Sequence, residues 1–287
     1  NHAYGAVLQG AERVARRCGG QVRIAEIPLE ADAEAACALV MAEVNPSTAL
    51  IVVDQITSAT ARAFPVEEIA RAASLLGVPV LVDAAHAPGV LEFPVPDFEG
   101  FWVGNLHKFA CAPRGTAALV ARGPAAQALE PLIDSWGFPY PFPEKFDHVG
   151  TQDVTSWMAA GTAFDTIEDR YGWATFRDYA TGLCDYGQSL IGGAFASATG
   201  QNPAVDVGMP VGPLRLVRLP AGLATTHEDS HAVRGYISDH LDIETAITTF
   251  NGKGYLRLSA HLYNSPNDYE IFAEKAVPEL VRLARSL

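Results

Sequence analysis

The first part of the chain alternates between two patterns of apolar residues. One places apolar side chains three and four residues apart, which is typical of helices that bury one face, and the other is a short apolar or alternating run, which is typical of strands. Pro65 at the start of one helical segment and Gly19 and Gly20 at the end of another agree with this pattern. The predicted helices cover residues 4–17, 32–44 and 65–76, and the predicted strands cover residues 21–27, 48–53, 78–82, 101–103 and 116–121.

The alternation of helices and strands predicts an α/β fold with a mostly parallel sheet and helices on both faces. From about Trp173 the pattern changes to one long helix followed by the order strand, helix, strand, strand, helix, which suits a smaller α+β domain. We therefore expect two domains, of residues 1–170 and 171–287. The later predicted elements are helices 154–167, 174–195 and 227–241, strands 214–219, 243–250 and 255–261, and a last helix from Asn267.

Composition narrows the class of protein. The chain has 287 residues, of which 49% are hydrophobic and 18% are charged, so it can bury a substantial core. Its formal net charge of −13 argues against a nucleic-acid or anionic-membrane partner, because both need basic patches. No apolar run reaches the roughly 18 residues that span a bilayer, and no signal-peptide pattern opens the chain. We therefore expect a cytoplasmic protein.

The four cysteines, Cys18, Cys37, Cys111 and Cys184, are scattered along the chain. None belongs to a CxxC motif or to a Cys/His cluster, so we predict neither a disulfide framework nor a bound metal. The chain begins with Asn1 rather than Met and enters a helical segment at once. We expect that further residues precede Asn1 in the natural protein.

Candidate catalytic residues stand after two predicted strands. The run 78–82 ends in Asp83, and the run 101–103 ends shortly before Lys108. Open α/β sheets place their ligands at the carboxyl ends of such strands. A lysine amine can form a Schiff base with the aldehyde of pyridoxal 5'-phosphate (PLP), and a carboxylate can keep the pyridine nitrogen protonated. Two histidines are close in sequence, His86 for the ring hydroxyl and His107 for the phosphate.

A simpler interpretation is that Asp83 only closes a strand and Lys108 is solvated on a loop. That is the commoner situation for any single Asp or Lys. Because the two residues follow consecutive strands and each has a histidine close by, we favour the cofactor interpretation.

Three further positions suit the same site, and each also has an ordinary structural explanation. Ser58, in the polar loop after strand 48–53, could contact the cofactor ring or the substrate, although turn hydroxyls more often bond to their own backbone. Thr151 precedes a helix and could bind a phosphate or simply cap that helix. Arg257 lies between two leucines on a predicted strand, where it could bind a substrate carboxylate or face solvent.

Several short strings match one enzyme family in their order and spacing. They are HAYGAV from His2, VDAAHAPG from Val82, WVGNLHKF from Trp102, PRG from Pro113, GTQD from Gly150 and LRLSAHLYNSPNDYE from Leu256. The chain thereby resembles class V aminotransferase-fold, PLP-dependent enzymes of fold type I, and the isopenicillin N epimerase-like subgroup is the most similar. The likeness covers essentially the whole chain but begins inside the family's large domain. The front part of a usual member, including its phosphate-binding loop, is therefore expected to be missing.

The resemblance implies catalytic and substrate-binding roles for four residues. Lys108 would form the Schiff base with the cofactor and Asp83 would pair with the pyridine nitrogen. His86 would lie near the ring hydroxyl. Arg257 would hold the carboxylate of a small amino-acid substrate, so the resemblance favours this role over exposure to solvent.

The resemblance also implies four further cofactor-binding residues. His2 would stack on the pyridine ring, and His107 would lie on the phosphate side of the lysine. Ser58 falls where some relatives have asparagine. Thr151 would reach the phosphate of a neighbouring subunit, which implies a homodimer with shared active sites.

The reaction type stays open at this stage. In every option Lys108 removes the Cα proton of an amino acid bound to the cofactor as an aldimine. Epimerisation returns a proton to the other face, β-elimination by a C–S lyase needs a leaving group at Cβ, and transamination needs a second substrate. A cysteine desulfurase needs a mobile thiol shortly before Arg257, and the last cysteine is Cys184, far upstream. We expect epimerase chemistry on the basis of the resemblance alone. The alternative outside active enzymes is a truncated, catalytically silent homologue.

Overall fold

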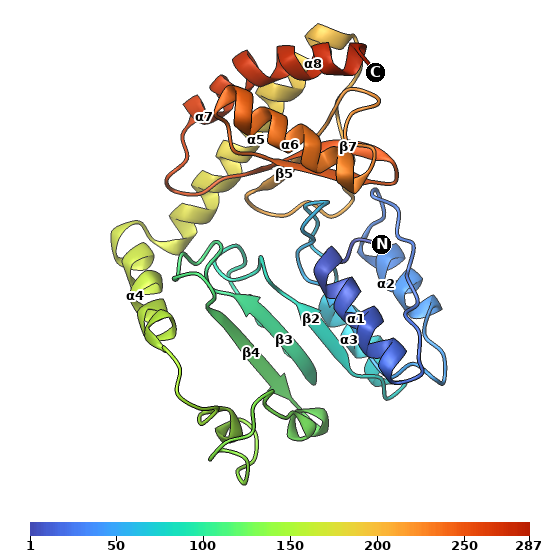
Figure 1. Ribbon diagram of the computed structural model, residues 1–287, viewed down its shortest axis with the longest axis vertical. Helices are drawn as coiled ribbons and strands as arrows, with labels where there is room; N and C mark the ends of the chain where they lie inside the picture. The colour runs from blue at the N-terminus through green and yellow to red at the C-terminus, as the bar shows by residue number, and fades with distance from the viewer.

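The computed structural model describes residues 1–287 and contains two β-sheets (Figure 1). The strands are β1 (Ile51–Asp54), β2 (Val80–Asp83), β3 (Gly100–Asn105), β4 (Ala117–Arg122), β5 (Leu214–Arg218), β6 (Ala246–Phe250) and β7 (Lys253–Ser259). The first sheet has the order β1-β2-β3-β4, in which β1, β2 and β3 are parallel and β4 is antiparallel to β3. The second sheet has the order β5-β7-β6 and is antiparallel.

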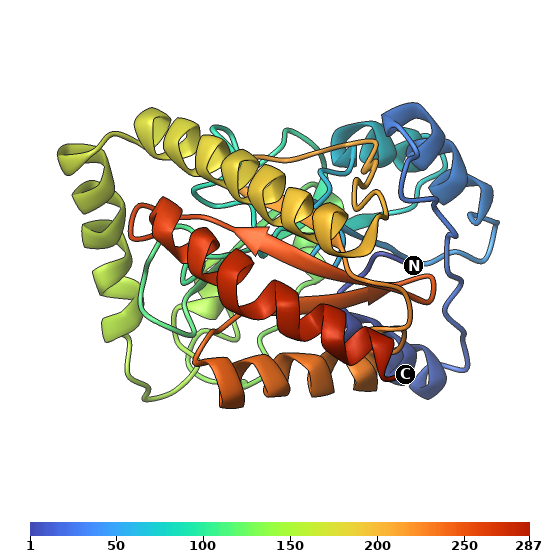
Figure 2. The same cartoon turned by 90° about the horizontal axis from the view of Figure 1, so that it is seen from above.

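Helices lie on both sides of the first sheet. The helices are α1 (Gly5–Arg17), α2 (Ala33–Ala42), α3 (Val66–Ser74), α4 (Thr155–Arg170), α5 (Trp173–Thr199), α6 (His227–Leu241), α7 (Pro266–Ile271) and α8 (Val277–Arg285), with short segments η1 (Pro124–Ala128), η2 (Glu144–Phe146) and the π-helical η3 (Phe272–Ala276). α3 packs against β1 and β2 and α2 against α3, whereas α1 lies on the other side (Figures 1 and 2). α5, α7 and α8 pack together over the outer face of the second sheet. No helix combines the length and apolar character that crossing a membrane requires.

Local sequence signals explain why the helices begin where they do. Asp32 caps α2 by accepting a hydrogen bond from the backbone N–H of Ala35, at 2.9 Å. Thr226 and Asp229 cap α6 reciprocally, each side chain accepting from the other residue's backbone N–H. Such caps are worth roughly 1 kcal/mol each. They place α2 and α6 within two residues of the predicted boundaries.

The predicted strand 21–27 is wrong. The segment runs without regular secondary structure, and no neighbouring strand pairs with it. Two of its backbone atoms bond to the side chain of Asn1 instead: the N–H of Ile27 donates to the side-chain oxygen, at 3.0 Å, and the carbonyl oxygen of Ile27 accepts from the side-chain nitrogen, at 3.3 Å. The alternation places Val22 and Ile24 on one face, but Ile24 is 37% exposed and the buried residue is Ile27, which is out of phase with them. A strand also needs a partner for its hydrogen bonds.

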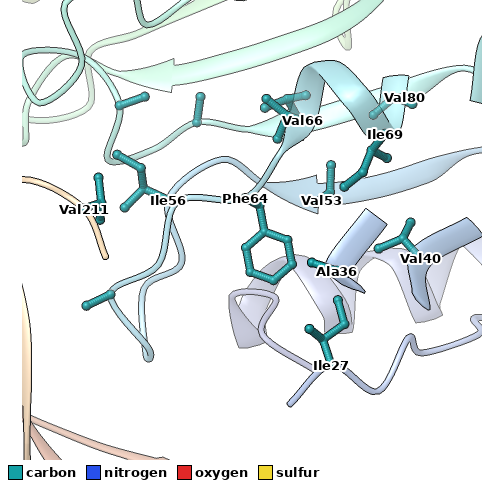
Figure 3. Packing of buried hydrophobic residues seen from close by; sticks show 14 of the residues in the cluster. Ile27, Ala36, Val40, Val53, Ile56, Phe64, Val66, Ile69, Val80 and Val211 are labelled. Carbon is teal, nitrogen blue, oxygen red and sulfur yellow. The ribbon is translucent and has the colours of Figure 1, made fainter. Parts of the chain in front are cut away.

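The core of the first sheet lies between the strands and the helices α2 and α3. Figure 3 shows Val53 and Val80 of the strands facing Val40 of α2 and Ile69 of α3, with the Phe64 ring between these elements. Ile69 and Val80 are at most 1% exposed. Burying side chains of this size stabilises the fold by roughly 1.5–3 kcal/mol each. This packing holds the parallel strands in register and therefore holds their carboxyl ends together.

A second core lies between the second sheet and the helices that cover its outer face, and β5 contributes to both cores. Leu216 belongs to the first cluster of buried side chains and its neighbour Val217 to the second, because successive residues of a strand face opposite sides. The element order after α4 is the predicted one: helix, strand, helix, two strands and a helical end. The predicted domain boundary between residues 170 and 171 stays a prediction, because β5 contributes side chains to both cores and so links the two parts.

Candidate functional site

Two carboxylates meet where the parallel strands end. Asp54 is the last residue of β1 and Asp83 the last residue of β2, and the two are paired in register. Paired residues of parallel strands project to the same face. That face is opposite to Val53 and Val82, which point into the first core, so both carboxylates lie on the side of the sheet where α1 lies. The sequence alone could not show this pairing.

Lys108 lies in the turn that joins β3 to β4. The turn is tied by backbone hydrogen bonds from Cys111 N–H to the Lys108 carbonyl oxygen, at 3.1 Å, and from Ala112 N–H to the Leu106 carbonyl oxygen, at 2.9 Å. Nζ of Lys108 lies 3.2 Å from Nε2 of His86, in the loop after β2. The structure therefore brings together three of the predicted residues, Asp83, His86 and Lys108.

The surroundings of Lys108 and His86 favour the uncharged forms of both side chains. Burial lowers the pKa of Lys108, the carboxylate of Asp83 raises it, and the guanidinium of Arg257 lowers it again. Burial and the positive charges of Lys108 and Arg257 lower the pKa of His86 to about 3. His86 is therefore a neutral imidazole at physiological pH. The lowered pKa of Lys108 increases the fraction of its amine that is unprotonated. Such an amine can act as a nucleophile or a base.

Asp54 is a residue of this site that sequence reasoning did not select. It is 5% exposed, and its Oδ1 has no hydrogen-bond partner. Burial and the neighbouring charge of Asp83 raise the pKa of Asp54 to about 7. The signal was present in the polar segment that follows strand β1, but only the strand register shows that Asp54 stands beside Asp83.

Replacing Asp54 with asparagine is expected to remove a pH dependence of stability. The raised pKa means that the folded protein holds a proton that the unfolded chain releases. The associated stability is complete below about pH 4 and is lost as the pH rises toward about 7. By linkage it amounts to at most about 4 kcal/mol. Urea unfolding of the protein without added cofactor at pH 4.5, 6 and 8 measures it.

The matched control for this prediction is Asp239→Asn, on the exposed surface of α6. We expect Asp239→Asn to keep the decline in unfolding free energy between pH 4.5 and 8, and Asp54→Asn to flatten it. If both variants follow the profile of the unmodified protein, the carboxyl group of Asp54 does not hold the proton.

Arg257 reaches the site from the second sheet. It lies on β7, and its Nη1 donates to the carbonyl oxygen of Ser58, at 2.6 Å, and to the Ser58 hydroxyl, at 3.3 Å. Its Nε is buried and has no partner, and burial lowers the pKa of the guanidinium. Ser58 and Arg257 line a cavity of about 770 Å³, a volume in the range of small-molecule sites. The guanidinium therefore faces this cavity and not open solvent, and the lining of the cavity does not include Asp83, His86 or Lys108.

His2 is engaged by protein groups. It is 5% exposed, its Nε2 lies 2.9 Å from the Ile27 carbonyl oxygen, and its Nδ1 lies 2.8 Å from the hydroxyl of Thr60. Its ring stacks on Phe250, with 4.4 Å between the ring centroids. Burial, more than any other cause, lowers the pKa of His2 to about 4. Stacking of His2 on a pyridine ring stays a prediction, since the ring is already stacked on Phe250.

The two predicted phosphate contacts lie in different places. Nδ1 of His107 lies 3.0 Å from the carbonyl oxygen of Thr116 and donates to it, which leaves Nε2 for another partner. Thr151 is exposed in the loop before α4. That loop lies away from the carboxyl end of β3, at the lower left of Figure 1. The structure does not bring Thr151 to the Lys108 site of its own chain, and its predicted role in a neighbouring subunit stays a prediction.

Comparison with known proteins identifies the family. Residues 2–194 match the family model "Aminotransferase class-V". The chain belongs to this family. Relatives of this class-V protein include isopenicillin N epimerase of Streptomyces clavuligerus, 26% identical over 283 residues, and a probable chloroplastic L-cysteine desulfhydrase of Arabidopsis thaliana, 25% identical over 307 residues.

The matches cover most of this class-V protein and a smaller share of its relatives. The alignments take in 92% and 98% of this chain, but 68% of the epimerase and 63% of the desulfhydrase. Among solved structures, a cysteine desulfurase of Thermococcus onnurineus superposes with a TM-score of 0.69 at 19% identity, covering 98% of this chain and 70% of that protein. The class-V protein therefore has the predicted α/β fold of PLP-dependent enzymes of fold type I.

PLP is the cofactor of this family, and the residues at the sheet edge fit it. Lys108 supplies an amine whose pKa is lowered, and Asp83 supplies a carboxylate for the pyridine nitrogen. Asp54 Oδ1 and Arg257 Nε are buried without partners, which is uncommon for polar atoms unless a bound group satisfies them. Lys108, Asp83 and His86 are the residues of this class-V protein that would hold the cofactor.

Proposed function

We propose that this PLP-dependent enzyme removes and returns a proton at the α-carbon of a small amino acid, as an epimerase does. The observation that carries the proposal is the placement of the Lys108 amine 3.2 Å from His86, in the loop that follows Asp83, with the Arg257 guanidinium bonded to Ser58 in the loop after the neighbouring strand. A base and a group that binds a carboxylate are what a reaction at Cα requires. Similarity to isopenicillin N epimerases supports return of the proton to the opposite face.

Asp83, Lys108 and Arg257 each have a separate role in this reaction. When bound, PLP supplies a sink for the electron pair left at Cα after proton removal. Asp83 Oδ1 accepts a hydrogen bond from the backbone N–H of Ala85, at 3.0 Å, which orients the carboxylate. Lys108 takes the Cα proton, and neutral His86, at 3.2 Å, can exchange a hydrogen bond with Nζ. Arg257 binds the substrate carboxylate and so fixes the position of Cα.

A C–S lyase that eliminates a group from Cβ is the second candidate. Relatives named "Probable L-cysteine desulfhydrase, chloroplastic" in Arabidopsis thaliana and "Putative L-cysteine desulfhydrase 1" in Oryza sativa have 25% and 26% identity to this chain, as the epimerases do. Elimination would use the same base and the same carboxylate contact. Cysteine desulfurase chemistry lacks support from Cys184, which is buried and whose Sγ donates to the Pro213 carbonyl oxygen.

Isotope exchange separates these reactions. The protein loaded with PLP is incubated with single L-amino acids in deuterated water, and proton NMR and optical rotation are followed. We expect deuterium at Cα together with loss of optical activity. Release of pyruvate and ammonia, with the remaining amino acid still entirely the L-enantiomer, would contradict the epimerase and support the lyase. A protein that stays colourless after addition of PLP would support the silent homologue.

We also propose that the enzyme is a homodimer with shared sites. Support comes from apolar side chains that are exposed in the segment 132–138, which precedes Thr151 in the chain. They include Leu132, Ile133, Trp136 and Phe138, of which Trp136 is 87% exposed. Large exposed apolar groups that lie close together are typical of protein–protein contacts. Sedimentation velocity that finds only monomer at micromolar concentration would refute this proposal.

A further inference from the structure

The segment after β7 holds the turn that carries Lys108. His261, two residues past the end of β7, is 4% exposed. Its Nε2 lies 3.0 Å from the carbonyl oxygen of Phe109 and 3.4 Å from Sγ of Cys111. A carbonyl oxygen only accepts hydrogen bonds, so Nε2 carries the proton and donates it. The donor comes from a residue 152 positions away in the chain.

The ring of His261 is neutral with its proton on Nε2. Nδ1 is buried and has no hydrogen-bond partner, so a second proton there would be an unpaired buried donor. Burial lowers the pKa of His261, and the hydrogen bond to Phe109 opposes this. The tautomer that satisfies the Phe109 carbonyl is therefore the one that the surroundings favour.

The His261 ring is itself fixed in place. It packs on Phe176, which is completely buried, and on Tyr263, with ring centroids 4.4 Å and 4.8 Å away. Its backbone N–H donates to the side-chain oxygen of Asn264, at 3.0 Å. Because these contacts hold the His261 ring in place, its hydrogen bond to Phe109 would break if the Lys108 turn moved. It therefore restrains the turn.

The loop that carries His86 approaches the same carbonyl from another direction. Gly89 has φ +86°, and a Cβ built there would lie 2.9 Å from the Phe109 carbonyl oxygen. Only glycine lets the backbone come this close. The Phe109 carbonyl therefore contacts the His86 loop and accepts from His261, and Phe109 is the residue next to Lys108.

We propose that His261 is a positioning residue for Lys108: by donating to the Phe109 carbonyl it fixes the Lys108 turn against the sheet that carries Arg257. Arg257, four residues earlier on the same segment, contacts Ser58 in the loop after β1. One segment of the second sheet thus touches two of the three loops that leave the carboxyl ends of the parallel strands, the loop after β1 and the turn after β3. The inference rests on the proposed role of Lys108, but the restraint itself can be measured without cofactor or turnover.

Two substitutions separate the hydrogen bond from the bulk of the side chain. His261→Gln keeps an N–H donor near the position of Nε2, and His261→Leu keeps apolar bulk without a donor. In protein without cofactor, the first readout is the alkylation rate of Cys111 by iodoacetamide, followed by peptide mass. Cys18, exposed at the end of α1, is the internal control in the same samples.

The second readout is the pH midpoint for acetylation of Lys108, with exposed Lys253 as its internal control. Because burial lowers the pKa of Lys108, a loosened turn should raise this midpoint. We expect His261→Leu to raise the Cys111 rate roughly five-fold relative to Cys18, the factor that one lost hydrogen bond supplies, and to raise the Lys108 midpoint. His261→Gln should restore both values.

The proposal is overturned if His261→Leu leaves the Lys108 midpoint unchanged, even if Cys111 reacts faster, because the effect would then be confined to the thiol. It is also overturned if His261→Gln behaves like His261→Leu, since packing and not the donor would be responsible. If His261→Leu does not fold, His261→Asn, whose amide is too short to reach Phe109, takes its place. Failure of the unmodified protein to bind PLP would refute the proposed function and leave these readouts intact.

Discussion

Replacing Lys108 with alanine should lower kcat by roughly 10³-fold, the middle of the range for a lost general base. Lys108 is the amine that stands at the sheet edge beside His86 and within the field of Asp83. His86 cannot take over, because burial and nearby positive charges lower its pKa to about 3 and leave it a weak base. Stopped assays with the substrate found by isotope exchange measure the loss.

A covalent label makes the same prediction independent of substrate. Borohydride treatment of the unmodified protein with PLP should bleach its visible band and leave a stable adduct on Lys108, which peptide mass locates. Lys253→Ala, on the exposed start of β7, is the matched control and should keep both the band and the activity. An adduct on another lysine, or full activity of Lys108→Ala, would show that Lys108 is not the catalytic amine.

Replacing Arg257 with leucine should raise KM for the amino acid by roughly 10- to 100-fold, because hydrogen bonds to charged groups contribute about 1.5–3 kcal/mol. The cofactor band should stay intact, since Arg257 lies on β7 while Lys108 and Asp83 belong to the first sheet. Leucine also leaves the Ser58 carbonyl oxygen without its donor, so urea unfolding must accompany the kinetics. The distinguishing result is a change in KM with the absorption spectrum preserved.

Arg215→Leu is the matched control for this substitution. Arg215 lies on β5 of the same sheet, paired with Leu258, and its guanidinium forms a salt bridge with Asp185. It faces the side opposite to Arg257, because Arg257 is paired with the next residue of β5, Leu216. We expect Arg215→Leu to change stability and not KM. Equal KM values for Arg257→Leu and the unmodified enzyme would refute the carboxylate assignment.

Elements and residues with local signals could be predicted from the amino-acid sequence. Asp83 closes an apolar run, and Lys108 follows the next run within a few residues, so the periodicity of the strands was enough to place them at one sheet edge. The helix boundaries at Asp32 and Thr226 follow from caps that involve residues three positions away. Such local signals can be recognised without knowledge of the fold, because the interacting residues lie within a few positions of each other in the sequence.

Features that depend on residues distant in the chain could be recognised from the folded structure and not from the sequence. The strand expected over residues 21–27 failed because no second strand lies beside it, which its own alternation could not reveal. Asp54 became part of the site through the register of β1 with β2. Arg257 meets Ser58 across 199 residues, and His261 meets Phe109 across 152. These contacts depend on how two sheets pack together, and that packing is a property of the whole chain and not of any short stretch of it.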